Sequence, residues 1–335
     1  MFLKEQCLHL QIENLNTLKD KKIKGKRMSN EIKEIIAAAI DYLHKEQLQY
    51  DVPNILYQYS DLAALKGVAA NDVLWATHFR YLNDRKEFYL GLDLAINFAK
   101  DALKKYSCEY VLKILEEMSS VREESGKYDL LPLHDTDVYS ISFSKERDLL
   151  SQWRGYGKKY KSVCMGFQTS KLKVDRIVGK VPYLLRKVVY DREKQKSLIN
   201  KYLTIVCDAI EVDSNFLKGN PGTFIELKRS LWTGLISLIL SFKEECWKEE
   251  EEWRVITISN DLPVKFKECE HGLVPFIEVP IFSECAFRAF DEVILPRTDD
   301  FVLYKKSLRM FFEGIRKQKG GVFPDIHESD ISIVY

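Results

Sequence analysis

Hydrophobic and polar positions along the chain follow two different periods, and segments with the same period are grouped together. Strict alternation over residues 138–144 predicts a strand with one buried face. Shorter β-like runs predict further strands over residues 55–59, 72–77, 162–167, 181–190, 253–258, 276–279, 291–295 and 331–334. Helical spacing predicts helices over residues 31–49, 62–68, 83–105, 108–122, 149–156 and 301–315. Because strands and helices are segregated, without regular βαβ alternation, the pattern predicts an α+β fold around a mixed sheet.

Two long stretches with helical periodicity, residues 193–217 and 224–251, are predicted to form an antiparallel helical hairpin. The sequence Gly219-Asn220-Pro221-Gly222 between them is typical of a turn. No internal repeat and no low-complexity linker interrupts the chain. The sequence therefore predicts a single α+β domain over residues 28–335, with the hairpin at about 193–251 as an elaboration.

The first 27 residues differ in charge from the rest of the chain. They carry seven Lys/Arg and three Asp/Glu, which leaves 44 basic and 47 acidic residues in the remainder. The sequence Met28-Ser29-Asn30-Glu31 is typical of a fresh start, since Ser or Asn caps a following helix well. Residues 1–27 are therefore either an upstream extension outside the native product or a basic arm that contacts a polyanion.

The overall composition is that of a globular protein with 46% hydrophobic residues and a net charge of +1, so no global field favours nucleic acid or membrane. Seven cysteines are spread widely without a C-x-x-C pair, which predicts free thiols in a reducing compartment and no zinc site. The longest uncharged run, Ser230 to Phe242, is too short to cross a bilayer. These features predict a cytoplasmic protein without a metal or a membrane partner.

An acidic run, Glu249 to Glu252, lies between two tryptophans and leads directly into the β-like segment 253–258. On a strand, Glu252 and Arg254 point to one face and Trp253 to the other. If Trp253 enters the core, Glu252 and Arg254 share an open face, where a carboxylate beside a guanidinium stays ionised and can stabilise a cation. The structural alternative is a Glu–Arg pair that ties the strand to the helical hairpin, and both interpretations stay open.

Four segments of the chain form a specific combination of motifs. They are Leu56–Leu62 with Leu74-Trp75 and Tyr81–Phe88; Ser142–Ser144 with Leu149–Gly157 and Cys164–Phe167; Phe242-Lys243 with Trp247-x-x-Glu250-x-Glu252-Trp253-Arg254; and Val293–Pro296. Taken together, these segments resemble the bacterial domain-of-unknown-function 2971 (DUF2971) family over about residues 55–335. The resemblance implies a setting in defence against phage and names no reaction.

The first predicted strand, its Tyr59-Ser60 pair, the short helix and the second strand are similar to the opening of ADP-ribosyltransferase-like domains. This resemblance implies that NAD is the substrate, that Ser60 holds the nicotinamide ribose, and that Glu252 or Glu250 is the catalytic acidic residue. A His on the first strand of that family is replaced here by Gln58. Glutamine both donates and accepts hydrogen bonds, so ribose binding is compatible with the change.

Further candidate binding residues come from the aromatic and basic side chains around these motifs. Tyr57 and Tyr59 share one strand face, and Ser60 is predicted to cap the following helix, a place that also suits a phosphate. Trp153 and Arg154 offer a stacking ring and a cation before two glycines. The alternatives are core aromatics with a helix cap and a Trp–Arg core contact. The predicted cofactor-binding residues are Tyr57, Gln58, Ser60, Trp153, Arg154 and Arg254.

Two hypotheses from different classes follow. In the first, the protein is an ADP-ribosyltransferase-type effector that transfers ADP-ribose from NAD to a protein or nucleic-acid acceptor. In the second, it is a non-catalytic sensor or binding module for a nucleotide, a nucleic acid or a phage protein, and the segment Glu250 to Arg254 is an ion-pair latch. In both, the sequence Asn83-Asp84-x-x-Glu87 is predicted to be a helix start with a structural role.

Overall fold

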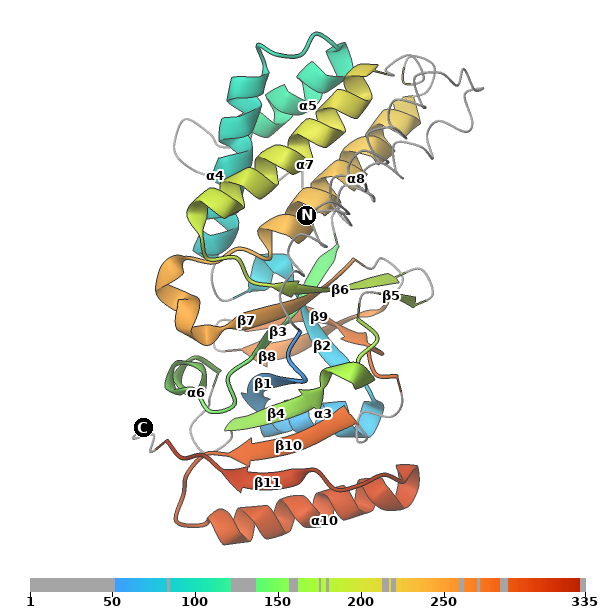
Figure 1. Cartoon of the computed structure of the whole chain (residues 1–335). Helices are drawn as coiled ribbons and strands as arrows, with labels where there is room; N and C mark the ends of the chain where they lie inside the picture. The colour runs from blue at the N-terminus through green and yellow to red at the C-terminus, as the bar shows by residue number, and fades with distance from the viewer. Residues whose placement is uncertain are drawn as a thin grey trace, which may run out of the picture. The chain divides into compact units, whose positions relative to one another are not determined.

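The computed structural model describes residues 52–82, 85–121, 137–156, 162–174, 176–178, 181–212, 217, 221–258, 262–269, 272–283 and 289–331 (Figure 1). The chain forms two compact units. The described part of the helical unit comes from Asp93–Asp135 and Leu198–Gly234, and that of the sheet unit from Leu43–Leu92, Thr136–Ser197 and Leu235–Tyr335. The predicted basic extension 1–27 and the predicted helix 31–49 lie outside the described residues.

In the described residues the sheet unit is built on one mixed sheet of eleven strands. The strands run in the order β11-β10-β4-β1-β3-β2-β9-β8, and β7 pairs with β3 and with β6, which pairs with β5. Strands β10 and β11 are parallel, and the other pairs are antiparallel. The α+β prediction is thereby confirmed. The strands are β1 Ile55–Asp61, β2 Leu74–His78, β3 Val138–Ser144, β4 Ser162–Gln168, β5 Arg176–Val178, β6 Val181–Lys187, β7 Glu252–Ile258, β8 Val264–Cys269, β9 Gly272–Val279, β10 Phe290–Leu295 and β11 Asp325–Glu328.

The main core lies on one face of this sheet, where α3 (Leu62–Asn71) and α10 (Phe301–Lys319) cover it. Alternate residues of the strands, such as Phe143 and Trp253, point to this face and are almost fully buried. The helices contribute the apolar side of their own surface, as the 3.6-residue period dictates. The core residues from the two helices include Leu65, Val68, Leu308, Phe312 and Ile315.

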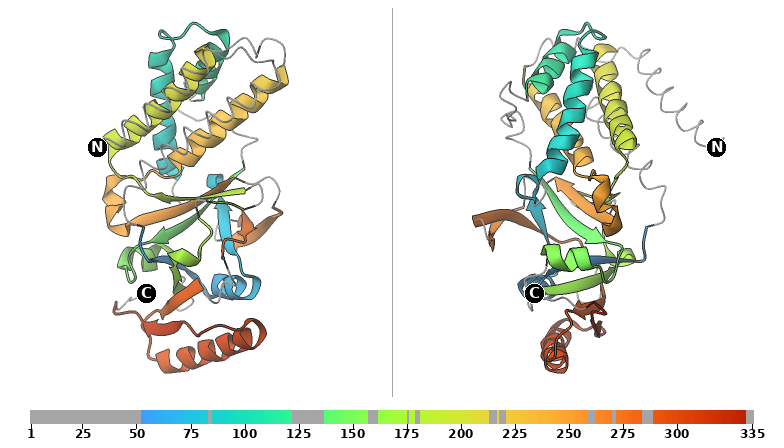
Figure 2. Two further views of the ribbon diagram at one scale, coloured as in Figure 1. Left: turned by 45° about the vertical axis from the view of Figure 1, so that its right-hand side comes forward. Right: turned by 90° about the vertical axis from the view of Figure 1, so that its left-hand side faces the viewer.

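The helical unit contains α5 (Glu109–Ser120) and the parts of α4 (Arg85–Ala102), α7 (Arg192–Val212) and α8 (Pro221–Ile239) that fall within its bounds. These helices lie side by side in both views of Figure 2. Inside the unit, Tyr202 of α7 donates a hydrogen bond to the carbonyl of Leu231 in α8 at 2.9 Å. The Glu211 carboxylate accepts from the backbone of Ser107 and Cys108 and so caps the start of α5. No helix in the described ranges is long and apolar enough to span a membrane.

The second helix of the predicted hairpin ends earlier than expected. Helix α8 stops at Ile239, and the segment 245–250 forms the 3₁₀ helix η6 (Glu245–Glu250). The reason is a backbone contact that the local pattern does not contain. The Val189 N–H donates to the carbonyl of Ser241 at 2.8 Å, and the Lys243 N–H donates to the carbonyl of Val189 at 3.2 Å. The backbone beside Val189 therefore replaces the next helical turn.

Three edge strands were not predicted from the sequence. Among the strands that the structure describes, β5 pairs only with β6, β8 only with β9, and β11 only with β10. Strand β5 has three residues, and β8 and β11 are rich in charged residues, so none of them contains the apolar run that marks a buried strand. The strand predicted over 331–334 is wrong at its first residue, since Ile331 lies at a bend, and residues 332–334 lie outside the described part.

Candidate functional site

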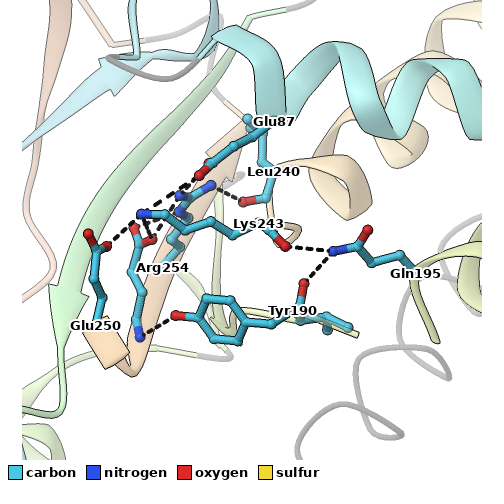
Figure 3. Close-up of polar contacts among 9 residues, drawn as sticks. Glu87, Tyr190, Gln195, Leu240, Lys243, Glu250 and Arg254 are labelled. Atoms are coloured by element: carbon cyan, nitrogen blue, oxygen red, sulfur yellow. Dashed lines mark hydrogen bonds and ion pairs between the residues drawn. The ribbon is translucent and has the colours of Figure 1, made fainter. Parts of the chain in front are cut away.

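Five ionisable side chains form a buried cluster on the face of the sheet opposite the main core (Figure 3). They come from four elements of the sheet unit, namely α4, the segment after α8, η6 and β7. Each residue is 6% exposed or less. We call this group the ion cluster, and its members are Glu87, Lys243, Glu250, Glu252 and Arg254.

The Glu252 carboxylate is fully engaged within the ion cluster. Its Oε1 accepts from Arg254 Nε at 2.7 Å, and its Oε2 accepts from Arg254 Nη2 at 2.9 Å and from Lys243 Nζ at 3.0 Å. Burial alone would raise the pKa of Glu252, but the charges of Arg254 and Lys243 lower it to about 2. The carboxylate is therefore ionised and occupied by partners from its own chain.

The two cations of the cluster tie separate segments to β7. Arg254 Nη1 donates to the carbonyl of Leu240 at 2.8 Å, and Nη2 donates to Glu87 Oε2 at 3.1 Å. Lys243 Nζ also donates to Glu250 Oε2 at 2.5 Å. Although burial alone would lower it, the pKa of Lys243 is raised by the carboxylates of Glu252 and Glu87. The start of α4, the end of α8 and η6 are thereby joined to one strand.

Two polar side chains hold the backbone around the ion cluster. The Glu252 N–H donates to the Tyr190 hydroxyl at 2.9 Å. The Gln195 amide nitrogen donates to the carbonyls of Val189 and Lys243 at 2.7 and 2.9 Å (Figure 3). Neither Tyr190 nor Gln195 belongs to a motif that the sequence singled out, and their contacts with Glu252 and Lys243 span 62 and 48 positions of the chain.

Glu87 is the least satisfied member of the ion cluster. Its Oε1 lies 3.7 Å from Lys243 Nζ and makes no hydrogen bond with any residue in the described part of the chain. Burial raises the pKa of Glu87 to about 7, even though Arg254 and Lys243 act in the opposite direction. With three carboxylates around two cations, protonation of Glu87 leaves the cluster electrically neutral. The helix-start interpretation of Glu87 did not include this contact with Arg254.

A single row of residues across the sheet leads from the ion cluster to a second buried carboxylate. Neighbouring strands β7, β3, β1, β4 and β10 place successive members of this row opposite one another. Four strand spacings separate its ends, which corresponds to roughly 19 Å. The row consists of Glu252, Ser144, Tyr57, Gly166 and Glu292.

The far end of the row forms a smaller polar group, the Glu292 cluster, made of Tyr57, Arg147, Glu292 and His327. The Tyr57 hydroxyl donates to Glu292 Oε1 at 2.9 Å, and Arg147 Nε donates to both Glu292 oxygens at 2.9 Å. His327 Nε2 lies 3.6 Å from Glu292 Oε2. Burial, followed by the contact with Glu292, raises the pKa of the Tyr57 hydroxyl. The Glu292 side chain is 10% exposed, whereas those of Arg147 and His327 are 36% and 46% exposed.

Gly166 makes the contact between Tyr57 and Glu292 possible, because these residues lie on the two strands that flank β4. A Cβ at position 166 would lie 2.9 Å from Tyr57 Cε1 and 3.2 Å from Glu292 Cγ. We expect Gly166→Ala to lower the free energy of unfolding by about 1–3 kcal/mol, since a ring and a bonded carboxylate must move apart. Urea unfolding measures this change.

The matched control for this substitution is Gly314→Ala, because a Cβ there has no neighbour within 4 Å. Alanine within a helix is more favourable than glycine by up to about 1 kcal/mol, so the control is expected to be neutral or stabilising. Equal stability of Gly166→Ala and the wild type would show that the close approach over Gly166 is relaxed without cost.

The predicted acidic residues and Arg254 are brought together, but not on an open face. Glu252 and Arg254 do point to the side of β7 opposite Trp253, as the alternation predicts. That side is covered by Glu87, Leu240 and Lys243, so the expected exposure of the pair is wrong. Of the neighbouring carboxylates, Glu249 is exposed and Glu251 lies 3.4 Å from Lys187.

Predicted binding residues on β1 are divided between its two faces. Tyr57 belongs to the Glu292 cluster, whereas Gln58 and Ser60 alternate to the other face and are half-buried. Ser60 is not the helix cap, because β1 continues through Asp61, whose Oδ1 accepts from the Ala64 N–H at 2.9 Å. The cap is therefore one residue later than predicted.

Trp153 and Arg154 have different environments on α6 (Leu150–Tyr156). The Trp153 ring is buried edge-to-face against Tyr59, with centroids 5.2 Å apart, and its Nε1 donates to Asp148 at 2.6 Å. Trp153 is thus a core side chain in the same apolar cluster as Tyr57 and Tyr59. Arg154 is exposed. In the described ranges, no group of three or more His, Cys, Asp or Glu side chains is placed to hold a metal.

Comparison with known proteins gives one family match. Residues 152–255 match the model of the family described as "Protein of unknown function (DUF2971)", which confirms the resemblance to that family. The matched stretch contains Trp153, Gly166 and four of the five residues of the ion cluster. Neither the curated proteins nor the solved structures give a match.

Proposed function

We propose that this protein is a non-catalytic binding module that recognises the phosphate groups of a nucleotide through Arg147. The observation that carries the proposal is the way Arg147 is held. Its Nε donates to both oxygens of the buried Glu292, which anchors the guanidinium at the Glu292 cluster. Its two terminal amino groups make no hydrogen bond with any residue that the structure describes, and the side chain is 36% exposed.

A guanidinium anchored in this way suits a phosphate ligand. Its planar array of N–H donors matches two phosphate oxygens, and anchoring reduces the entropy that is lost on binding. His327, with a side chain that is 46% exposed and lies 3.6 Å from Glu292, supplies a second donor at the same cluster. NAD is the first nucleotide to test, because the similarity to ADP-ribosyltransferase-like domains implies it.

The state of Glu252 supports binding without turnover. A carboxylate that stabilises a ribose cation must reach the substrate, but both Glu252 oxygens are occupied and the residue is 3% exposed. Transfer through Glu252 would require the ion cluster to open. The hypothesis in which Glu250 to Arg254 form an ion-pair latch therefore agrees better with the contacts. A role in phage defence, a cytoplasmic location and a protein or nucleic-acid partner belong to this proposal as expectations.

The test is calorimetric titration of NAD and ADP-ribose into the wild type and Arg147→Lys. Lysine can still pair with Glu292, but it lacks the two terminal amino groups with which the arginine would donate hydrogen bonds to a phosphate. We expect NAD to bind the wild type and to bind Arg147→Lys at least about tenfold more weakly, which corresponds to about 1.4 kcal/mol. Arg316→Lys is the matched control, since Arg316 is 46% exposed and also paired to a glutamate.

Nicotinamide release, measured in the same samples, separates binding from catalysis. The proposal predicts no release by the wild type. Release that is lost in Glu252→Gln would establish the transferase instead and show that the ion cluster opens. Failure of both NAD and ADP-ribose to bind the wild type would remove the nucleotide from the proposal.

A further inference from the structure

Helix α10 presents one side to the core and leaves the other uncovered. Leu308, Phe312 and Ile315 pack into the main core on the side that faces the sheet. Lys319 fixes the end of the helix, since its Nζ donates to the Ala70 carbonyl at 2.8 Å and to Asp72 at 2.6 Å. The helix is therefore firmly held at the edge of the sheet unit, next to β11 (Figures 1 and 2).

The outer side of α10 combines exposed apolar side chains with free cations. Val302, Leu303 and Met310 are 79%, 62% and 68% exposed. Single exposed apolar residues are common, but three along one helix mark an interaction surface. Three exposed cations, Lys306, Arg309 and Lys317, form no ion pair or hydrogen bond with any residue in the described part of the chain.

The spacing of these residues arranges them in a line. Leu303, Met310 and Lys317 are seven residues apart, so they lie above one another at intervals of about 10 Å along the helix. Residues repeating every seven positions form the contact seam between two packed helices. At Gly314, between Met310 and Lys317, a Cβ would have no neighbour within 4 Å, so a second backbone can approach closely there.

We propose that the outer face of α10 docks an acidic amphipathic helix of a partner protein. Leu303 and Met310 would pack against the apolar positions of that helix, and the three cations would meet its carboxylates. A second copy of this chain does not fit, because pairing α10 with itself would bring like charges together. This surface is separate from the Arg147 site and does not depend on the proposed function.

A membrane is a weaker match than a helix for the same surface. Helices that lie in a lipid interface separate an apolar face, which enters the bilayer, from a basic face. On α10 the lysines and the apolar side chains share one face, so insertion of Met310 would also bury Lys306 or Lys317. Interleaved apolar and charged positions are instead usual at a helix–helix seam, where the charges flank the apolar contacts.

The test uses a synthetic helical peptide of about three heptads, with leucine at the a and d positions and glutamate at e and g. Fluorescence anisotropy with the full chain measures binding. We expect the glutamate peptide to bind, and its lysine counterpart not to bind. Leu303→Asp and Lys306→Glu are each expected to weaken binding at least about tenfold. The matched control is Leu273→Asp, which alters a side chain that is 63% exposed on β9.

Three results would overturn the proposal. The first is no binding of the glutamate peptide at up to ~1 mM. The second is equal binding of the two peptides, which would remove the charge argument. The third is sedimentation of the protein with phosphatidylcholine vesicles containing roughly one-third phosphatidylserine, lost in Leu303→Asp, which would assign the surface to a membrane. Because Leu303 is 62% exposed, its substitution leaves the fold intact, and circular dichroism verifies this.

Discussion

Replacing Arg254 with alanine is expected to lower the free energy of unfolding by about 3–5 kcal/mol, because it leaves buried carboxylates without their main partner. Arg254 donates two hydrogen bonds to the Glu252 carboxylate, one to the Glu87 carboxylate and one to the Leu240 carbonyl. Without it, three carboxylates share the single cation of Lys243. The loss is far larger than for a surface ion pair, since water cannot replace the missing donors.

Urea unfolding measures this loss, and Arg154→Ala is the matched control. Arg154 is exposed on α6, so its substitution is expected to stay within about 0.5 kcal/mol of the wild type. A second comparison separates lost packing from stranded charge. The double variant Arg254→Met/Glu252→Met is expected to be more stable than Arg254→Met alone, because it removes the carboxylate that the first change strands. If Arg254→Ala unfolds at the same urea concentration as the control, the ion cluster is not a structural latch.

The second large effect is a pH dependence that depends on Glu87. The pKa of Glu87 is raised from 4.5 to about 7 in the folded protein, so between these values the folded state binds the proton more tightly than the unfolded state. The free energy of unfolding therefore falls as the pH rises through this window. The full fall is about 3 kcal/mol. Glu87→Gln carries a neutral side chain at every pH, so this fall is expected to disappear in the variant.

Urea unfolding at pH values from about 4 to about 8 provides the measurement. At the acidic end the wild type and Glu87→Gln are expected to be equally stable, and at the alkaline end the variant is expected to be more stable. Glu313→Gln, which changes a partly exposed carboxylate on α10, is the control and should follow the wild-type curve. A wild-type curve that is flat from pH 4.5 to 7 would mean that Glu87 is ionised at no cost.

Glu252 acts in the opposite direction and in a different window. Its folded-state pKa is lowered to about 2, so the stability that it contributes is present above pH 4.5 and is lost as the pH falls toward 2. The two glutamates therefore destabilise the fold at opposite ends of the acidic range.

Local periodicity was sufficient to predict most strands and the directions of the β7 side chains. Alternation places Trp253 on one face and the Glu252–Arg254 pair on the other, and the structure agrees. Alternation does not reveal which other segments of the chain pack against each face of the strand. Glu87 approaches Arg254 from 167 positions earlier in the sequence, so no local window reveals that the expected open face is closed.

The same limit applies to the Glu292 cluster. Tyr57 was predicted as a binding residue, but Glu292 and Arg147 were not, since neither belongs to a motif with Tyr57 along the chain. Their meeting depends on the strand order, which places β4 between β1 and β10. The glycine at position 166 was visible in the family motif, and its purpose becomes evident only when the side chains on both sides are known.

The predicted start of α3 was wrong because two adjacent residues are both suitable helix caps. Ser60 and Asp61 are both good capping residues, and the choice between them is made by β4, whose Ser162 pairs with Asp61 and extends β1 by one residue. The end of α8 was missed for a different reason, because hydrogen bonds with the backbone of Val189, far away along the chain, replace the next helical turn.

The strand order also has a consequence for how the polypeptide is made. Tyr57 and Glu292 are 235 positions apart in sequence, yet they meet over one glycine in the middle of the sheet. Such distant pairings are slow to form, because the entropy of closing a long loop is lost before the contact can stabilise the chain. A ribosome must therefore synthesise the chain as far as β10 before β4 acquires its second neighbour, and the unpaired edge of β4 is exposed to other chains until then.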